Sequence, residues 1–268
     1  MEKKLDISVI SPVFNELENL ETFVESVTDV MNSINMSWEL IIIDDGSDDG
    51  SSKILKKIGR QENIRSILLS KNYGQTTAIQ AGFDNAVGEY FVTLDSDLQN
   101  DPKDIPMLIQ KLMNEELDLV VGWRKDRKDN YFFRNLPSIL ANKLIGTITG
   151  VKLHDYGCSL KAYRAEVLKE VKLYGEMHRF IPAIAAEVGA KIIEIPVKHH
   201  PRKTGKSKYG IDRTLRVILD LIWIQFSRRY MHRPIHAFGG IGLTMLSAGL
   251  IIFLWLFFEK VLFGSEIG

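Results

Sequence analysis

Residues 90–97 read YFVTLDSD, an apolar and aromatic run, Tyr90–Leu94, that leads directly into two aspartates. Four similar runs occur in the first 125 residues, at Ile7–Val13, Glu39–Ile43, Ser66–Leu69 and Leu117–Val121. Apolar runs of about four to eight residues between polar clusters are typical of strands that are buried on both faces. The stretch therefore predicts one strand of a buried, mostly parallel sheet.

Helical patterns separate these runs. The clearest spans Leu20–Ile34, where apolar residues recur every three or four positions, with Asn15 and Glu18 placed as an N-cap and its partner. Two more are Gln75–Val87, which Gly88 would end, and Asp104–Asn114. Alternating strands and helices predict an α/β fold, a mostly parallel sheet with helices on both faces.

Three of the predicted strands end in polar or acidic residues. The first strand leads into the segment 11–16, the second into Asp44 and the fourth into Asp95 and Asp97. Each aspartate alone is explained by turn or cap chemistry, but three such ends on one sheet favour a site. Ligands of these sheets bind beyond the carboxyl ends of the strands. An Asp-x-Asp pair there offers the oxygen ligands that Mg²⁺ takes together with substrate phosphates.

Composition and missing motifs exclude several classes of protein. Lys+Arg and Asp+Glu both number 34, which argues against a dedicated nucleic-acid binder. The single Cys158 excludes a disulfide framework and a multi-cysteine zinc site. The sequence has no Gly-x-Gly-x-x-Gly after the first strand, no Walker loop and no His-Glu-x-x-His. A phosphate compound held by metal, rather than by a glycine loop, is the ligand we expect.

The zero net charge hides a basic segment followed by a long apolar one. Between Lys198 and Pro234 there are ten Lys and Arg residues against two acids, whereas Pro234–Phe258 contains no Asp, Glu, Lys or Arg. A helix of about 22 residues rises about 33 Å, enough to cross a hydrocarbon core of about 30 Å. We therefore expect residues 235–258 to form a transmembrane helix.

The charges that flank this span predict its orientation. Three arginines between Arg228 and Arg233 precede the span and Lys260 is the only base after it, so residues 1–234 should be cytoplasmic. The stretch Arg213–Ser227, within the segment 211–233, has a narrow polar stripe, and apolar residues cover the rest of its surface. That pattern is typical of a helix at the membrane interface, and a core helix of the soluble domain would show it as well.

Five stretches, taken in order, resemble successive motifs of the family 2 glycosyltransferases. They are SVISPVFNELENL, IIIDDGSDDGS, LSKNYGQTTAIQAGFDNAVGEYFVTLDSDLQNDPKDIP, DYGCSLKAYRAEVL and HHPRKTGKSKYG. Within that family the chain is similar to the polyprenyl-phosphate group, which includes dolichol-phosphate mannosyltransferase and bacterial undecaprenyl-phosphate glucosyltransferases. The resemblance covers most of residues 5–230 and implies a GT-A fold, a Rossmann-like α/β architecture.

The resemblance also implies a reaction. One sugar passes, with inversion, from a nucleotide sugar to a polyprenyl phosphate such as undecaprenyl phosphate, at the cytoplasmic face of the inner membrane. UDP-glucose or another UDP-hexose is the expected donor, UDP the product, and Mg²⁺ or Mn²⁺ the cofactor. GDP-mannose as donor, or diacylglycerol or a polysaccharide as acceptor, are alternatives. A sugar-nucleotide pyrophosphorylase and a silent membrane adaptor are alternatives from other classes, and a homo-oligomer is left open.

Carried over position by position, the resemblance assigns roles to residues of this chain. Asp95 and Asp97 would be the metal pair, with Asp97 the better candidate for a direct, catalytic ligand. Asp155 would contact the sugar or act as a base, or serve only in a turn. The expected nucleotide-sugar residues are Pro12, Val13, Glu16, Asp44, Asp95, Ser96 and Gln99. The expected acceptor-phosphate residues are Arg124, Arg134, Ser138, Arg202 and Lys208.

The expected domains follow from these segments. A catalytic GT-A domain would cover residues 1–210, an amphipathic interfacial helix 211–233 and a transmembrane helix 235–258. Residues 259–268 would form a short tail. Many relatives of the bacterial subgroup have two transmembrane helices, so this tail either precedes a second span or belongs to a member with one.

Overall fold

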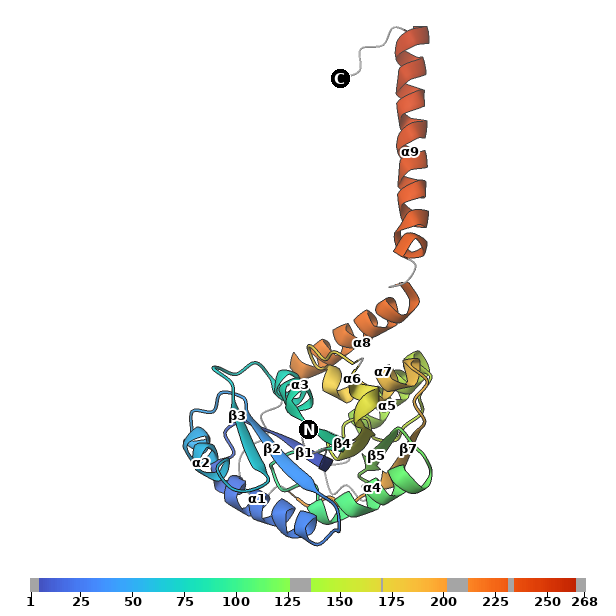
Figure 1. Ribbon diagram of the computed structural model, residues 1–268. Helices are drawn as coiled ribbons and strands as arrows, with labels where there is room; N and C mark the ends of the chain where they lie inside the picture. Colours follow the sequence, from blue (N-terminus) through green and yellow to red (C-terminus); the bar gives the residue numbers. More distant parts are fainter. Residues whose placement is uncertain (1–4, 126–135, 170, 202–211, 231–233, 264–268) are drawn as a thin grey trace. The chain divides into compact units, whose positions relative to one another are not determined.

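The computed structural model describes residues 5–125, 136–169, 171–201, 212–230 and 234–263 (Figure 1). The strands are β1 (Leu5–Val13), β2 (Trp38–Asp44), β3 (Ile64–Leu68), β4 (Gly88–Thr93), β5 (Leu119–Trp123), β6 (Lys161–Arg164) and β7 (Ile192–Pro196). The helices are α1 (Leu17–Asn32), α2 (Ser51–Ile58), α3 (Gln75–Asn85), α4 (Ile105–Asn114), α5 (Leu136–Thr149), α6 (Ala165–Lys169), α7 (Ile181–Glu187), α8 (Asp212–Tyr230) and α9 (Pro234–Phe263), with 3-10 turns η1 (Pro102–Asp104) and η3 (Met177–Arg179).

The chain divides into two compact units, Met1–Val217 and Ile218–Gly268. In the described residues of the first unit, seven strands form one sheet in the order β3-β2-β1-β4-β6-β5-β7. Every neighbouring pair is parallel except those of β6, which is antiparallel to both β4 and β5. The mostly parallel α/β sheet is confirmed. Strands β1 to β5 match the five predicted strands within two residues at each end, whereas β6 and β7 were not predicted.

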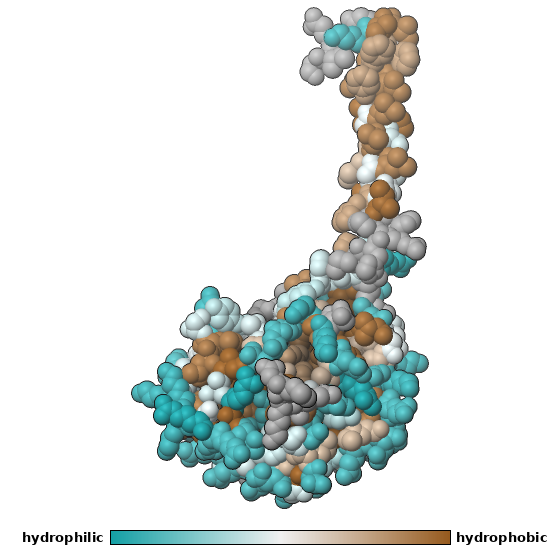
Figure 2. Space-filling view, viewed as in Figure 1, coloured by the Kyte–Doolittle hydropathy of each residue, from teal (hydrophilic) through white to brown (hydrophobic). Residues whose placement is uncertain are grey.

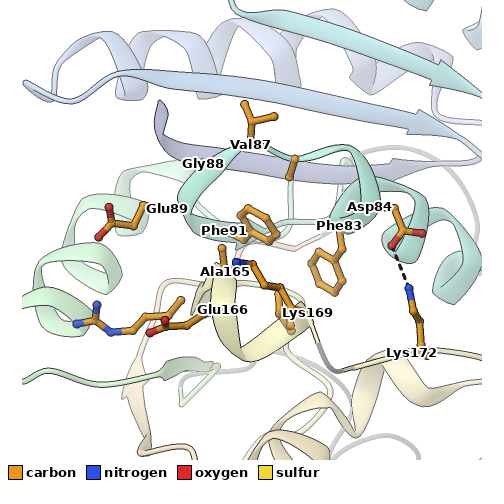
Figure 3. A pocket seen from close by; sticks show the side chains of 13 residues that line it. Phe83, Asp84, Val87, Gly88, Glu89, Phe91, Ala165, Glu166, Lys169 and Lys172 are labelled. Carbon is orange, nitrogen blue, oxygen red and sulfur yellow. Dashed lines mark ion pairs between the residues drawn. The ribbon is translucent and has the colours of Figure 1, made fainter. Parts of the chain in front are cut away.

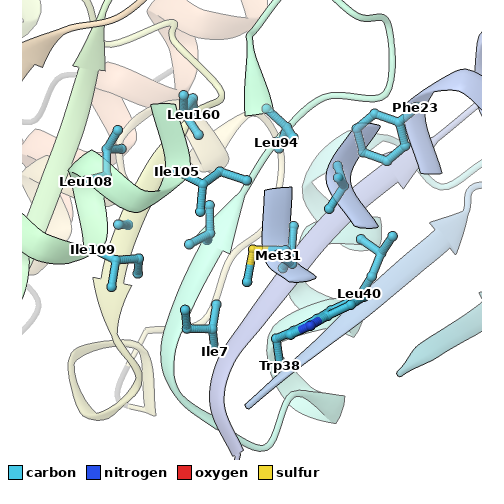
Figure 4. Packing of buried hydrophobic residues seen from close by; sticks show 14 of the residues in the cluster. Ile7, Phe23, Met31, Trp38, Leu40, Leu94, Ile105, Leu108, Ile109 and Leu160 are labelled. Atoms are coloured by element: carbon cyan, nitrogen blue, oxygen red, sulfur yellow. The ribbon is translucent and has the colours of Figure 1, made fainter. Parts of the chain in front are cut away.

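Helices cover both faces of the sheet. Ile7 and Val9 of β1 belong to a core cluster that includes apolar residues of α1 and α4 (Figure 4). Ile10 faces the other way, toward α3, where a Cβ built on Gly82 would lie 2.3 Å from the Ile10 Cγ2. Because successive side chains of a strand point to opposite faces, this alternation buries the sheet between two helical layers.

The start of α1 differs from its prediction. Asn15 has a left-handed backbone, with φ of 54°, and its side chain exchanges two hydrogen bonds with Asp48, at 2.8 and 3.0 Å. The carboxylate of Asp49 accepts a hydrogen bond from the Leu17 amide at 3.0 Å. The predicted cap by Asn15 and Glu18 is therefore wrong, because Asn15 ties the chain to the loop after β2.

Gly88 has a different role from the predicted helix end. Helix α3 stops at Asn85, and Gly88 is the first residue of β4. Its amide donates to the Ser8 Oγ at 2.9 Å, and a Cβ there would lie 2.6 Å from the Ser8 backbone nitrogen. Glycine is needed at this position because β4 approaches the backbone of β1 too closely for a side chain.

The second unit is helical in its described residues. Helix α9 contains the apolar segment Phe238–Leu262, which is 25 residues long. Its most apolar window of 18 residues has a mean hydropathy of 2.3, and none of that window is buried. Figure 2 shows apolar side chains along the visible face of this helix. By length and composition α9 can cross a membrane, and it extends beyond the predicted span of 235–258.

Helix α8, which crosses the boundary between the two units, has two apolar faces. Leu219 and Ile222 are more than half exposed, whereas Leu221 and Ile224 are each 3% exposed. The wide apolar face predicted from the sequence therefore contains a buried part and an exposed part.

We expect Gly88→Ala to lower the free energy of unfolding by about 1–3 kcal/mol, because the added methyl group forces β4 away from β1. Denaturant unfolding in detergent, followed by circular dichroism, measures this change. The adjacent Val87→Ala is the control: Val87 is 45% exposed, so its change should stay within about 0.5 kcal/mol. Equal unfolding midpoints for the two variants would contradict the close approach of the strands.

Candidate active site

The chain turns sharply after β4, and this carboxylate turn (residues 95–100) contains the predicted metal pair. Asp97 accepts a hydrogen bond through Oδ1 from the Gln99 amide at 3.2 Å. Leu98 has a φ of 59°, in the left-handed region that residues with side chains rarely adopt. Strained backbone of this kind costs about 1–3 kcal/mol and is common at functional sites.

Two other elements contact the carboxylate turn. Gln75, the first residue of α3, donates through Nε2 to the Asp95 Oδ1 at 2.8 Å. Ser96 donates to the carbonyl oxygen of Pro12, near the end of β1, at 3.3 Å. The structure therefore brings together Pro12, Asp95 and Ser96, three residues that the sequence assigned to nucleotide-sugar binding.

The other predicted nucleotide residues occupy more varied positions. Val13 is 1% exposed and its side chain packs in the core cluster. Asp44 is also 1% exposed and accepts from the Ser47 amide at 3.1 Å, within its own turn. Glu16 is partly exposed and accepts from the Asn19 side chain at 2.7 Å. Val13 and Asp44 thus belong to the buried framework beneath this edge, whereas Glu16 reaches its surface.

Asp45 was not predicted as a site residue, although it is as buried as its neighbour Asp44. Its carboxylate accepts from the amides of Tyr73 and Gly74 at 2.7 and 2.8 Å, so it fixes the loop that leads into α3. Burial raises the pKa of Asp45, and these two hydrogen bonds oppose that effect only in part. Asp45 therefore supports the start of α3, where Gln75 donates its hydrogen bond to Asp95.

Arg124 and Asp155, to which the sequence gave separate roles, form one ion pair. Arg124 Nε lies 2.7 Å from Asp155 Oδ2 and Nη2 lies 2.9 Å from Oδ1, so the contact is bidentate. The side chains are only 13% and 8% exposed. Burial alone would lower the pKa of Arg124, but the adjacent carboxylate more than offsets this and raises it.

This pairing limits what either residue can do. A carboxylate with both oxygens bonded to a guanidinium is a weak base, because the pairing favours its charged form. Asp155 also accepts from the Gly157 amide at 3.1 Å, within its own turn. The geometry favours the structural interpretation of Asp155, and it leaves Arg124 with its charge already compensated by the protein.

Lys161, at the start of β6, is a buried cation that sequence reasoning missed. It is 3% exposed and donates to the carbonyl oxygen of Cys158. Burial lowers the pKa of Lys161 to about 8, against the opposing charges of groups that include Asp155 and Asp95. The strand KAYR is too short to show a periodicity that would have marked this lysine as buried.

The predicted acceptor-phosphate residues are only partly described. Arg134, Arg202 and Lys208 lie outside the described residues, and so does the side chain of Ser138, which is in α5. The segment that leads to Arg202 is described: His199 forms an isolated β-bridge with Asn100 of the carboxylate turn. The basic stretch of the sequence thus begins beside the carboxylate turn.

A groove of about 560 Å³ lies elsewhere on the first unit (Figure 3). It is lined by the end of α3, the start of β4 and α6, including Phe83, Glu89, Phe91 and Lys169. The carboxylate turn follows the opposite end of β4. This groove is therefore separate from the site at the carboxyl ends of the strands.

The acidic residues fit a divalent cation whose coordination is completed by a substrate. No group of three or more His, Cys, Asp or Glu that could hold a metal occurs among the described residues. Asp95 and Asp97 supply a pair of carboxylates at one turn, and Mg²⁺ is usually bound by one or two carboxylates plus substrate phosphates. The arrangement fits such an open site rather than a closed structural one.

Comparison with known proteins shows the family of the chain. Residues 8–172 match the family model Glycosyl transferase family 2. The chain is a family 2 glycosyltransferase. This glycosyltransferase is 52% identical over 270 residues to dodecaprenyl-phosphate galacturonate synthase of Rhizobium johnstonii, covering 99% of this chain and 80% of that one. It is 39% identical over 218 residues to undecaprenyl-phosphate 4-deoxy-4-formamido-L-arabinose transferase of Edwardsiella ictaluri, covering 81% and 66%. It therefore belongs to the polyprenyl-phosphate group.

Solved structures agree on the fold of this glycosyltransferase. Glucosyl-3-phosphoglycerate synthase from Mycobacterium tuberculosis, in complex with Mn²⁺ and UDP-glucose, superposes with a TM-score of 0.62 at 19% identity, covering 84% of this chain and 79% of that one. At this identity the likeness concerns the fold alone. The predicted GT-A architecture is confirmed.

We expect Asp155→Ala to lower the free energy of unfolding by about 3–5 kcal/mol, because it leaves the Arg124 guanidinium buried without its counter-charge. The double variant Arg124→Met, Asp155→Leu should recover most of that loss, since it removes both charges and fills the space. Unfolding in detergent compares the three proteins. An Asp155→Ala variant as stable as the wild type would argue against the buried pair.

Proposed function

We propose that this glycosyltransferase transfers galacturonate from a UDP-sugar donor to a polyprenyl phosphate, with inversion and release of UDP. The observation that carries the proposal is the carboxylate turn, which places Asp95 and Asp97 beside the end of β1. The 52% identity over 99% of the chain to a dodecaprenyl-phosphate galacturonate synthase favours galacturonate over glucose. UDP as the nucleotide is supported by the UDP-glucose in the structural neighbour.

Asp97, together with Asp95, would hold Mg²⁺ or Mn²⁺. When bound, the cation supplies positive charge to a diphosphate leaving group that becomes more negative as the sugar–oxygen bond breaks. Pro12, Glu16 and Gln99 would surround the nucleotide at the same edge, with Val13 and Asp44 supporting them from below. The Mn²⁺ in the structural neighbour supports the choice of a divalent cation.

The proposed acceptor explains why the site needs no strong general base. A phosphate monoester has a second pKa of about 6, so it is already anionic near neutrality and can attack the anomeric carbon directly. Asp155 is bonded to Arg124 through both oxygens and need not accept a proton. The chemistry instead requires cations, because the acceptor phosphate and the donor diphosphate repel each other.

The acceptor cations are proposed from the sequence. Arg134, Ser138, Arg202 and Lys208 would contact the acceptor phosphate, since arginine is suited to bidentate phosphate contacts and serine can donate a hydrogen bond. Arg124 would support the site through its bidentate pair with Asp155, which joins the end of β5 to the segment before β6. Residues 1–210 would form the catalytic domain.

A membrane location suits a polyprenyl acceptor. Helix α9 is long and apolar enough to cross a bilayer, and the arginines before it favour a cytoplasmic catalytic domain at the inner membrane. Residues 211–233 would lie at the membrane interface, and 235–258 would span the membrane.

We expect Asp97→Asn to reduce sugar transfer by at least about 100-fold, which corresponds to about 2.7 kcal/mol of transition-state stabilisation. Excess EDTA should abolish wild-type activity, and Mn²⁺ or Mg²⁺ should restore it. The control is Asp84→Asn, an exposed aspartate beside the separate groove, which should transfer at the wild-type rate. Undiminished transfer by Asp97→Asn, or in EDTA, would refute the metal pair.

The donor and acceptor are tested together. Labelled UDP-galacturonate, UDP-glucose and GDP-mannose are each supplied with a polyprenyl phosphate, the same polyprenol without phosphate, or diacylglycerol. We expect labelled lipid only with the phosphate acceptor, and a turnover with UDP-galacturonate at least about tenfold above the other donors, because donor pockets discriminate through paired polar groups. Efficient transfer to the free alcohol or to diacylglycerol would contradict polyprenyl phosphate as the acceptor. A preference for UDP-glucose would contradict galacturonate as the transferred sugar.

A further inference from the structure

Ser159, in the segment before β6, contacts both ends of the carboxylate turn through its side chain. Ser159 Oγ accepts hydrogen bonds from the backbone amide of Asp95 at 3.3 Å and from the Asn100 Nδ2 at 2.8 Å. Asp95 and Asn100 are the first and last residues of the turn. One hydroxyl oxygen thus joins both ends of the loop that carries the metal pair.

The residues around Ser159 are themselves fixed. Its carbonyl oxygen accepts from the Thr93 Oγ1 at 2.7 Å, which ties it to the last residue of β4. The Cys158 thiol lies 3.6 Å from the Asn100 Oδ1, so the side-chain amide of Asn100 is held at both its nitrogen and its oxygen. Thr93, Cys158 and Asn100 are all buried. The serine hydroxyl is therefore presented from a rigid base.

The turn requires such support. Leu98, between the two tied ends, has the left-handed backbone described above, and a strained conformation persists only where its surroundings fix it. A metal site also needs its carboxylates close to the productive geometry before the ligand arrives. The hydrogen bonds that Ser159 Oγ accepts from both ends of the turn meet these two requirements at once.

We infer that Ser159 is a positioning residue, which sets the geometry of Asp95 and Asp97 for a divalent cation and the donor diphosphate. The inference deepens the proposed function and rests on it for the identity of the ligand. It assigns a role in donor binding to the segment 155–159, whose other end holds Arg124 through Asp155. Donor and acceptor sides of the site would then share one structural element.

The test uses the full chain in detergent and the variants Ser159→Ala and Ser159→Thr. Ser159→Ala removes the acceptor oxygen, and Ser159→Thr keeps it. A matched control is Ser26→Ala in α1, whose hydroxyl donates to the Phe23 carbonyl oxygen at 2.8 Å away from the site. The first measurement is amide hydrogen exchange over residues 95–100 without metal. The second is calorimetric binding of Mn²⁺ with UDP.

We expect exchange over the turn to be at least about tenfold faster in Ser159→Ala than in wild type, and the Kd for Mn²⁺ with UDP to rise about tenfold, because two donors lose their acceptor. Ser159→Thr and Ser26→Ala should resemble wild type in both measurements. Asn100→Ala, which removes one of the two donors, should change both measurements in the same direction and serves as the test if Ser159→Ala does not fold.

Wild-type exchange and wild-type binding in both Ser159→Ala and Asn100→Ala would overturn the inference. An equal loss in Ser26→Ala would overturn it too, because the effect would then be general destabilisation. If the wild-type chain binds no Mn²⁺ with UDP, the proposed function fails. The hydrogen-exchange comparison uses no ligand and still decides whether Ser159 fixes the turn.

Discussion

The register of β1 with its two parallel neighbours determines where the candidate active site of this protein lies. Val13 lies opposite Asp44 of β2, and Ile10 lies opposite Thr93 of β4. Parallel strands in this register end side by side, so the polar residues that follow them meet at one edge. The carboxylate turn, the Pro12 carbonyl and the start of α3 depend on that alignment, because a slip of one residue would turn every side chain to the opposite face.

The antiparallel strand β6 brings to this edge the residues that precede it, which a parallel strand would leave at the opposite edge. Lys161, its first residue, lies opposite both Thr93 and Val121, near the carboxyl ends of β4 and β5. An antiparallel strand enters the sheet where its parallel neighbours leave it, so the residues before it lie beside their polar ends. That is why Asp155 reaches Arg124 and why Ser159 reaches the carboxylate turn.

Much of this architecture could be predicted from the sequence, and the failures have physical reasons. Five strands were predicted because burial imposes apolar patterns on them, and the apolar helix because its uncharged run is long enough to cross a bilayer. Strand β6 has four residues and shows no pattern. Asp155 and Arg124 are 31 positions apart, so nothing local reveals their pairing. The incorrect cap at Asn15 and helix end at Gly88 arose because both residues serve partners distant in the chain, Asp48 and Ser8.

Helix α9 has a kinetic consequence for the proposed reaction. An enzyme anchored in the bilayer meets a lipid acceptor by lateral diffusion in two dimensions, and the shared membrane raises the effective concentration of the acceptor without any new contact. The residues that contact the acceptor phosphate can then bind it weakly, and the site is still occupied. Weak binding also lets the glycosylated lipid product leave. Turnover would follow the surface density of acceptor in the membrane rather than its bulk concentration.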